Sequence, residues 1–145
     1  MDQQALSDRI EIGELLARYA RAVDTKDWDL YRSVFTEDAY IDYRSAGAVD
    51  GDREKVTAFL AASLEPFPMT QHFITNVECE INGDEATVRA MFYNPMRFPG
   101  ADDLSYCGGF YRHRLVRTAG GWRSRELIED NAWFANPPSG LPGGA

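Results

Sequence analysis

The sequence is poor in the residues that most often bind metals or form covalent cross-links. Its 145 residues include two cysteines, Cys79 and Cys107, and two histidines, His72 and His113. None of the four lies at the short spacing of a zinc site, and two cysteines do not make a disulfide framework. The glycines form neither a Walker motif nor a GxGxxG motif after a strand. The sequence therefore predicts no bound metal and no cofactor.

Positive charge and long apolar runs are also scarce. The chain has 15 basic and 23 acidic residues, a net charge of −8 and a pI near 4.7. This balance disfavours nucleic acid and anionic membranes as partners, because both attract basic surfaces. No apolar stretch could span a bilayer, and the start MDQQALSDRIE lacks the pattern of a signal peptide. We expect a cytoplasmic protein that binds a small neutral or cationic ligand.

What is present fits one domain with a substantial core. A chain of this length buries roughly 70% of the surface that its unfolded form exposes, so it needs no disulfide or structural metal to fold. Hydrophobic residues make up 44% of the sequence, which is consistent with such a core. We predict one domain over residues 1–135 and a disordered tail, NPPSGLPGGA, over residues 136–145.

Helical periodicity dominates the first half of the chain. Apolar residues recur at helical spacing over residues 5–23, and shorter patterns predict helices over residues 28–35 and 53–64. For the first helix, Asp8 and Glu11 have the spacing of a capping box, although Asp2 or Ser7 could equally begin it. The stretch AYIDYRS, between the second and third helices, alternates like a strand.

The second half is predicted to be β-structure. Residues 73–81 alternate up to an Asn-Gly-Asp turn, a return strand begins at Ala86, and a long strand covers residues 104–117 before a fourth starts at Trp122. Gly108 and Gly109 indicate a bend or bulge in the long strand. Helices followed by a mostly antiparallel, curled sheet place the chain in the α+β class.

Two segments carry a resemblance to a known family. The stretch YARAVDTKDWDLYRSVFTEDAYIDYRS, from Tyr19 to Ser45, and the motif TQHFI, from Thr70 to Ile74, resemble scytalone dehydratase and related lyases. The closing pattern FYRHRLVRTAGGW is similar as well. The chain thus resembles the SnoaL-like and scytalone dehydratase-like branch of the nuclear transport factor 2-like superfamily. The resemblance implies a cone-shaped α+β barrel with N-terminal helices packed on a curved, mostly antiparallel sheet, and a ligand pocket inside the cone.

Asp24 and His72 match the family's pocket aspartate and catalytic histidine. A neutral imidazole can remove a proton near pH 7, and a carboxylate on its other ring nitrogen fixes the tautomer and stabilises the imidazolium. From the residues alone, the favoured interpretations are a hydrogen-bonded strand histidine for His72 and a polar residue at a helix end for Asp24, and the resemblance reverses this preference. If the catalytic interpretation holds, the two side chains should meet in one cavity. Strand alternation puts His72 on the same face as Ile74 and Asn76, opposite the more apolar face. Either this mixed face lines the cavity, or a bulge in the strand intervenes.

Tyr19 and Tyr43 match two pocket tyrosines of the same family. A phenol can polarise a carbonyl group or donate to a leaving hydroxyl group. On a continuous helix the five positions from Tyr19 to Asp24 rotate the two side chains about 140° apart, so both face one pocket only if the helix ends near Val23. The alternative is that both tyrosines are core aromatics.

The sequence also departs from the family pattern. Scytalone dehydratase has a second histidine on the strand after the hairpin, and here that region reads FYNPMRF, with Asn94 or Met96 at the closest match. Neither is an acid–base group. His113, in YRHRLV, is predicted to lie on a charged strand face with Arg112 and Arg114 as a structural or surface residue.

The remaining pocket assignments are aromatic and apolar side chains that suit a small polycyclic ligand. The residues predicted to bind substrate are Trp28, Tyr93, Met96, Tyr106 and Asn131. The leading functional hypothesis is a cofactor-independent dehydratase that acts on a hydroxylated cyclic ketone. The alternatives are an isomerase or polyketide cyclase that uses a similar enolate, and a noncatalytic ligand-binding protein. The resemblance further implies a homodimer or homotrimer.

Overall fold

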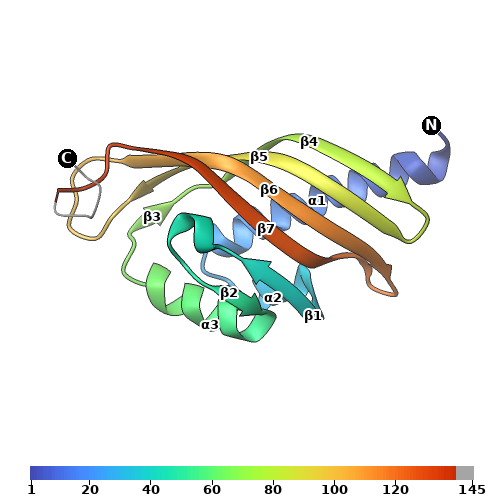
Figure 1. Ribbon diagram of the computed structural model, residues 1–145, viewed down its shortest axis with the longest axis horizontal. Coiled ribbons are helices and arrows are strands. Elements are labelled where there is room, and N and C mark those ends of the chain that lie inside the picture. The colour runs from blue at the N-terminus through green and yellow to red at the C-terminus, as the bar shows by residue number, and fades with distance from the viewer. Residues whose placement is uncertain (140–145) are drawn as a thin grey trace.

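One strongly curled sheet forms the body of the molecule, and the helices close it from one side (Figure 1). The computed structural model describes residues 1–139. The helices are α1 (Gln3–Asp24), α2 (Trp28–Ser33), α3 (Arg53–Leu64) and the short 3-10 helix η1 (Arg44–Ala46). The strands are β1 (Phe35–Asp42), β2 (Asp50–Asp52), β3 (Met69–Thr70), β4 (Phe73–Asn82), β5 (Glu85–Arg97), β6 (Ser105–Thr118) and β7 (Gly121–Ala135).

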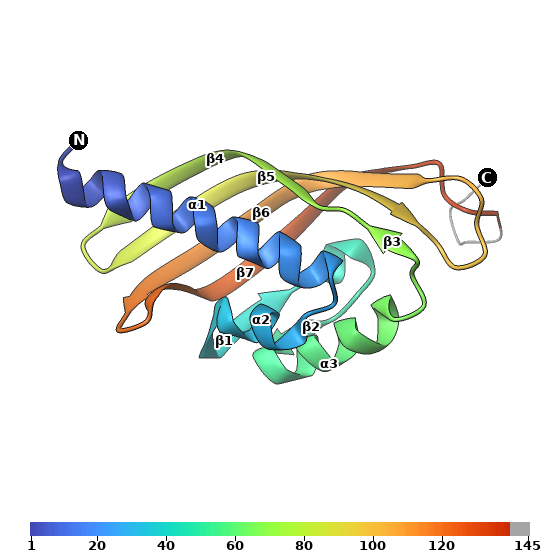
Figure 2. The ribbon, with the colours of Figure 1, turned by 180° about the vertical axis from the view of Figure 1, so that it is seen from behind.

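The strand order is β2-β1-β7-β6-β5-β3, with β4 also paired to β5. All pairs are antiparallel except β1 with β7, which is parallel. Figure 2 shows α1 running along the inner face of the long strands, whereas α2 and α3 lie beside β1 and β2. The predicted α+β cone with N-terminal helices on a curved sheet is therefore confirmed. Within residues 1–139, no helix is both long and apolar enough to cross a membrane.

Asp2 begins α1, which was one of the starts that the sequence left open. Its side chain accepts a hydrogen bond from the backbone nitrogen of Ala5 at 2.8 Å, as expected of an N-cap residue. Asp8 lies within the helix instead of capping it. Its buried carboxylate binds the guanidinium group of Arg117 at 2.7 Å and the indole nitrogen of Trp122 at 3.1 Å. The charged pair thus links α1 to the β6–β7 hairpin.

The other end of α1 matters more for the site. The helix stops at Asp24, and Lys26 takes a left-handed conformation with φ of 57°. The helix thus ends one residue after Val23, and Asp24 is its last residue. Tyr19 lines the cavity described below, whereas Asp24 does not line it and lies behind His72, which does. Lys26 Nζ then donates to the backbone oxygens of Glu65 and Phe67 at 2.9 Å, which ties this turn to the segment before β3.

Shifts in strand register help to decide which side chains face inward. The register of β4 against β5 shifts between Thr75 and Glu78, where Asn76 has φ of 51°. The extra residue of this bulge lets Ile74 and Cys79 face the same side. A second shift at Gly108 and Gly109 confirms the predicted bulge, since a Cβ atom on Gly109 would collide with the backbone of β7.

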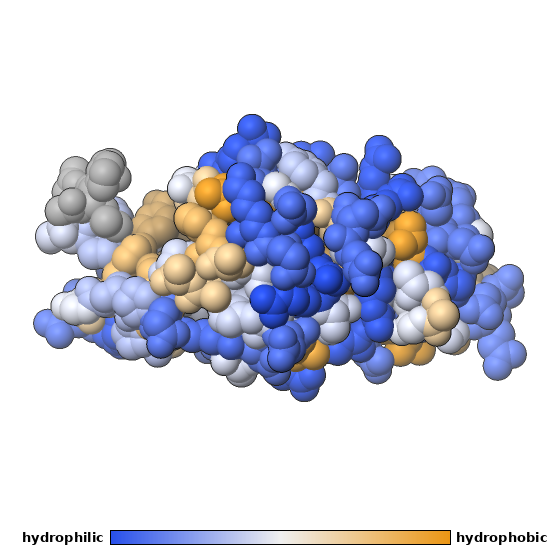
Figure 3. All heavy atoms as spheres, turned by 90° about the horizontal axis from the view of Figure 1, so that it is seen from below, coloured by the Kyte–Doolittle hydropathy of each residue, from blue (hydrophilic) through white to orange (hydrophobic). Residues whose placement is uncertain are grey.

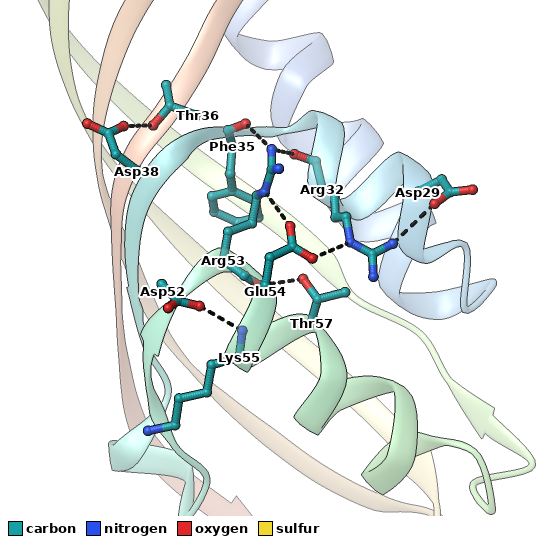
Figure 4. Close-up of polar contacts among 10 residues, drawn as sticks. All are labelled: Asp29, Arg32, Phe35, Thr36, Asp38, Asp52, Arg53, Glu54, Lys55 and Thr57. Carbon is teal, nitrogen blue, oxygen red and sulfur yellow. Dashed lines mark hydrogen bonds and ion pairs between the residues drawn. The ribbon is translucent and has the colours of Figure 1, made fainter.

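A polar cluster holds α3 against its neighbours (Figure 4). Glu54 accepts from Nε of Arg32 in α2 and from Nε of Arg53, both at 3.0 Å. Arg53 also donates to the backbone oxygen of Phe35 at the start of β1. The cluster is largely exposed, so its contribution to stability is small. It fixes the position of α3, one wall of the cavity described next.

Candidate active site

A cavity of about 520 Å³ lies between the inner face of the sheet and the helices. Its apolar lining includes Phe59, Leu60, Leu64, Phe67, Phe98 and Phe134. These residues come from α3, the segment after it and the region where β5 and β7 end. Figure 3 shows apolar side chains gathered toward the same end of the molecule, whereas most of the remaining surface in that view is polar. The polar lining includes Tyr19, Tyr43, Thr70, His72, Asn94, Cys107, Tyr111, Glu129 and Asn131.

Asp24 and His72 are in direct contact, although 48 residues separate them. The Nδ1 atom of His72 lies 2.6 Å from Oδ1 of Asp24, and the other carboxylate oxygen accepts from the backbone nitrogen of His72 at 2.8 Å. Thr70 Oγ1 donates to the same carboxylate at 3.0 Å. An ionised carboxylate can only accept, so Nδ1 is the donor in this contact, and in the neutral imidazole Nε2 is then the nitrogen with the lone pair. Because His72 lines the cavity, this nitrogen is available to a bound molecule.

Three tyrosines from different elements share hydrogen bonds beside the cavity. The hydroxyl oxygen of Tyr43 lies 2.6 Å from that of Tyr19 and 2.8 Å from that of Tyr31. Burial raises the pKa of each phenol above its ordinary value, because a phenolate would lose its hydration. Tyr19 and Tyr43 therefore remain neutral hydrogen-bond donors and acceptors at the cavity wall.

Glu129 is a cavity residue that the sequence analysis missed. It lies on the inner face of β7 with 8% of its surface exposed, and its Oε1 atom has no hydrogen-bond partner among the described residues. Burial raises the pKa of its carboxyl group to about 7, and the hydroxyl of Tyr111 opposes this shift. The sequence signal that could have identified Glu129 is its spacing along the strand. It lies two residues from Leu127 and two from Asn131, so the three side chains share one face.

A row of polar groups crosses the sheet near His72. Asn94 pairs with Cys107 across β5 and β6, and Asn131 lies beyond Cys107 on β7. Burial raises the pKa of the Cys107 thiol to about 11, so it stays protonated at neutral pH. In residues 1–139, Oδ1 of Asn94 is buried and lacks a partner. Asn94 thus occupies the region of the missing histidine as an acceptor without acid–base chemistry.

The residues predicted to bind substrate divide into two groups. Met96 and Asn131 line the cavity, as expected. Trp28 does not, because it packs edge to face on Tyr31 with ring centroids 5.7 Å apart. Tyr93 and Tyr106 do not line the cavity either. Strand alternation turns them to the outer face of the sheet, where their rings stack 6.2 Å apart.

His113 is buried, which corrects its predicted place on a charged strand face. Alternation along β6 turns Arg112 and Arg114 outward and His113 inward. Its Nδ1 atom lies 2.9 Å from Oγ of Ser124, and burial lowers its pKa to about 4. His113 is therefore a neutral core residue at physiological pH.

Two further predictions concern metal ligands and the C-terminal tail. Across residues 1–139, no group of three or more His, Cys, Asp or Glu side chains is arranged to hold a metal ion. The predicted tail begins at Asn136, whose side chain donates to the backbone oxygen of Leu104 at 2.7 Å. Residues 140–145 of that tail lie outside the described part of the chain.

Comparisons with known proteins agree with this architecture. The family model for the SnoaL-like domain matches residues 4–128. An uncharacterized protein of Mycobacterium tuberculosis is 40% identical over 125 residues, which cover 86% of this chain and 85% of the relative. A crystal structure of a protein from Kribbella flavida is 34% identical with a TM-score of 0.83, covering 91% of this chain and 95% of that chain.

A more distant solved structure is that of a hexachlorocyclohexane dehydrochlorinase, LinA type 2. It has a TM-score of 0.82 over 97% of this chain and 100% of that chain, with 19% sequence identity. A likeness at this identity shows a shared fold. The family match, by contrast, spans most of the sequence and includes the segment that holds Asp24 and His72. The chain therefore belongs to the SnoaL-like family of the nuclear transport factor 2-like superfamily.

Proposed function

We propose that this protein is a cofactor-independent lyase that removes water from a small hydroxylated cyclic ketone. The contact between Asp24 and His72 at the wall of a largely apolar cavity is the observation that carries this proposal. The contact leaves one basic nitrogen for a bound molecule, and the aromatic and aliphatic lining suits a cyclic ligand. Few other groups in the cavity could accept a proton near neutral pH.

The proposed reaction begins with removal of a proton from the carbon next to the substrate carbonyl. Nε2 of His72 takes this proton, and Asp24 stabilises the imidazolium that forms. Negative charge then develops on the carbonyl oxygen. The neutral hydroxyls of Tyr19 and Tyr43 are suited to donate hydrogen bonds to that oxygen. Loss of the hydroxyl group from the next carbon completes the double bond.

The names of relatives support an elimination. A dehydrochlorinase removes hydrogen chloride from its substrate, and the solved structure of that name shares this fold. Elimination of hydrogen chloride and elimination of water both begin with a base near an acidic C–H bond. The resemblance to scytalone dehydratase in the segments around Asp24 and His72 points in the same direction.

An isomerase is the second candidate, and the tyrosine cluster favours it. An enolate that forms beside Tyr19 and Tyr43 could be reprotonated at another carbon, which moves a double bond without loss of water. Both reactions share the first step. They differ in whether the substrate carries a leaving group next to the acidic carbon.

A substrate screen tests the proposal. Bicyclic β-hydroxy ketones such as 3-hydroxy-1-tetralone would be incubated with the protein, and formation of the aromatic product would be followed by absorbance and mass spectrometry. Matched unsaturated ketones would report double-bond migration. We expect catalysed loss of water at protein concentrations far below the substrate concentration. Tight binding of several ketones without turnover of any would contradict the proposal and indicate a ligand-binding protein.

A further inference from the structure

The proposed elimination needs an acid for the leaving oxygen as well as a base for the carbon-bound proton. Hydroxide is a poor leaving group, so protonation of the departing oxygen speeds its loss. Asn94 and Met96 occupy the region where related enzymes have a histidine, and neither can donate a proton in this way. Of the other acids in the cavity lining, the phenols and the thiol have pKa values raised by burial, and the carboxyl group of Glu129 gives up its proton more readily than they do.

Hydrogen bonds of the backbone hold Glu129 in place where β7 forms the cavity wall. Its backbone oxygen accepts from Oγ of Ser45 at 2.6 Å, and the same oxygen of Ser45 accepts from the backbone nitrogen of Asn131 at 2.8 Å. This bridge joins η1 to β7 and fixes the inner face of the strand. The side chain enters the cavity with Oε1 buried and without a partner among the described residues. Among the described residues no ion pair holds this carboxyl group, and Glu129 is one of the residues that line the cavity.

The surroundings of Glu129 disfavour a negative charge. None of the cavity-lining residues in the described part of the chain is an arginine or a lysine. The titratable groups close enough to interact electrostatically with Glu129 are Tyr19, Tyr31, Asp42, Cys107, Tyr111 and Asp130. Of these, Asp42 and Asp130 do not line the cavity and pair with Arg44 and Arg112. These groups are neutral or acidic, and the carboxyl is shielded from water. A carboxyl group in such a place keeps its proton near neutral pH.

We propose that Glu129 is the catalytic acid that protonates the leaving hydroxyl group during the elimination. This inference rests on the proposed function. The C–H bond breaks and its proton goes to Nε2 of His72, while its electron pair passes into the enolate of the substrate carbonyl group. The enolate then returns these electrons to form the new C=C bond as the hydroxyl group leaves. The C–O bond breaks, and the proton from the Glu129 carboxyl joins the departing oxygen to form water. Transfer of the proton from His72 back to Glu129 through water restores both groups.

Two probes separate the two proton transfers. 3-Hydroxy-1-tetralone must lose water, whereas 1-tetralone has the same acidic C–H bonds and no leaving hydroxyl. Exchange of the α-protons of 1-tetralone in D2O, followed by NMR, needs the base alone. We expect Glu129→Gln to lower the rate of water loss by about two to four orders of magnitude. The same variant should exchange the α-protons of 1-tetralone within a few-fold of the wild-type rate.

A matched control and a comparison variant complete the experiment. Glu126→Gln makes the same change three residues earlier on β7, where the side chain lies 3.8 Å from Arg114 and away from the cavity. It should match the wild type with both probes. His72→Ala should abolish both reactions. Circular dichroism and thermal unfolding verify that each variant is folded.

The outcomes distinguish the two proposals. Wild-type water loss in folded Glu129→Gln would overturn the role of Glu129 and leave the His72 mechanism standing. Equal loss of both reactions in that variant would also overturn it, because an acid for the leaving group has no part in exchange. Undiminished exchange in His72→Ala would instead contradict the proposed base.

Discussion

The hydroxyl oxygens of Tyr19 and Tyr43 lie 2.6 Å apart, which joins the first helix to the segment after β1 at the cavity wall. Tyr43 also reaches Tyr31, so its single hydroxyl serves two buried neighbours. A hydroxyl has one proton and two lone pairs, and Tyr43 can therefore donate to one neighbour and accept from the other. The phenols at the site depend on each other for their orientation.

Tyr43→Phe tests this dependence. Removal of the shared hydroxyl leaves the Tyr31 hydroxyl buried without the partner that it has in the structure, which costs about 1–3 kcal/mol. We expect the free energy of unfolding in urea to fall by this amount and turnover to slow. Tyr40→Phe is the matched control, since the Tyr40 hydroxyl binds Asp50 outside the cavity. An unfolding free energy unchanged in Tyr43→Phe would contradict the assigned network.

Glu129 should make the stability of the protein depend on pH. The carboxyl group has an ordinary pKa of 4.5 in the unfolded chain and a pKa raised by burial to about 7 in the folded protein. Between these two pKa values the carboxyl group of Glu129 is protonated in the folded protein and ionised in the unfolded chain. The free energy of unfolding therefore falls as the pH rises from 4.5 to 7. The loss amounts to about 3 kcal/mol and is complete above pH 7.

His113 acts in the opposite direction over much of the same window. Burial lowers the pKa of His113 from 6.5 in the unfolded chain to about 4 in the folded protein. Below pH 6.5 the unfolded chain therefore binds more protons at this residue than the folded protein does. The contribution of Glu129 is therefore measured as the difference in unfolding free energy between the wild type and Glu129→Gln. The amide side chain of this variant does not titrate, so the difference should change by about 3 kcal/mol from pH 4.5 to pH 7. A constant difference would show that Glu129 ionises normally.

Met96→Ala should alter binding more than chemistry. Met96 lines the cavity with 7% of its surface exposed, and truncation removes apolar contact with the ligand. We expect KM to rise by roughly tenfold, which corresponds to about 1.4 kcal/mol, with little change in kcat. Met91→Ala is the control, because Met91 is exposed on the outer face of the same strand. A large fall in kcat with unchanged KM would assign Met96 a different role.

Turnover should not require a metal ion. Each step of the proposed elimination is a proton transfer by a side chain, so no Lewis acid is needed to polarise the substrate. The rate of water loss should stay the same after extended dialysis against EDTA. Loss of activity that added zinc or iron restores would contradict the mechanism.

The sequence predicted the elements well because their periodic patterns are strong and local. The third helix over residues 53–64 coincides with α3, and the long hairpins follow from turns such as Asn82-Gly83. The end of α1 near Asp24 followed from a geometric condition on the site. The start at Asp2 could not be chosen over Asp8, because the role of Asp8 depends on Arg117, which is distant in sequence.

The pocket lining was harder to predict than the strands, because it depends on which face of each strand turns toward the cavity. Tyr93 and Tyr106 are aromatic and near the site in sequence, yet their strand phase turns them outward. Glu129 escaped notice for the opposite reason, since an acidic residue on a strand usually faces water. Its position two residues after the buried Leu127 was the local signal that it shares the inward face of β7.

The rates of two variants test most directly whether Asp24 and His72 act as a base and its orienting partner. His72→Ala should lower kcat for water loss from 3-hydroxy-1-tetralone by about two to four orders of magnitude, with a much smaller change in ligand affinity. Asp24→Asn should also slow turnover, because it removes the charge that stabilises the imidazolium. The control Asp29→Asn alters a carboxylate on the exposed surface of α2 and should keep wild-type kcat. A folded His72→Ala variant that turns over at the wild-type rate would contradict the account.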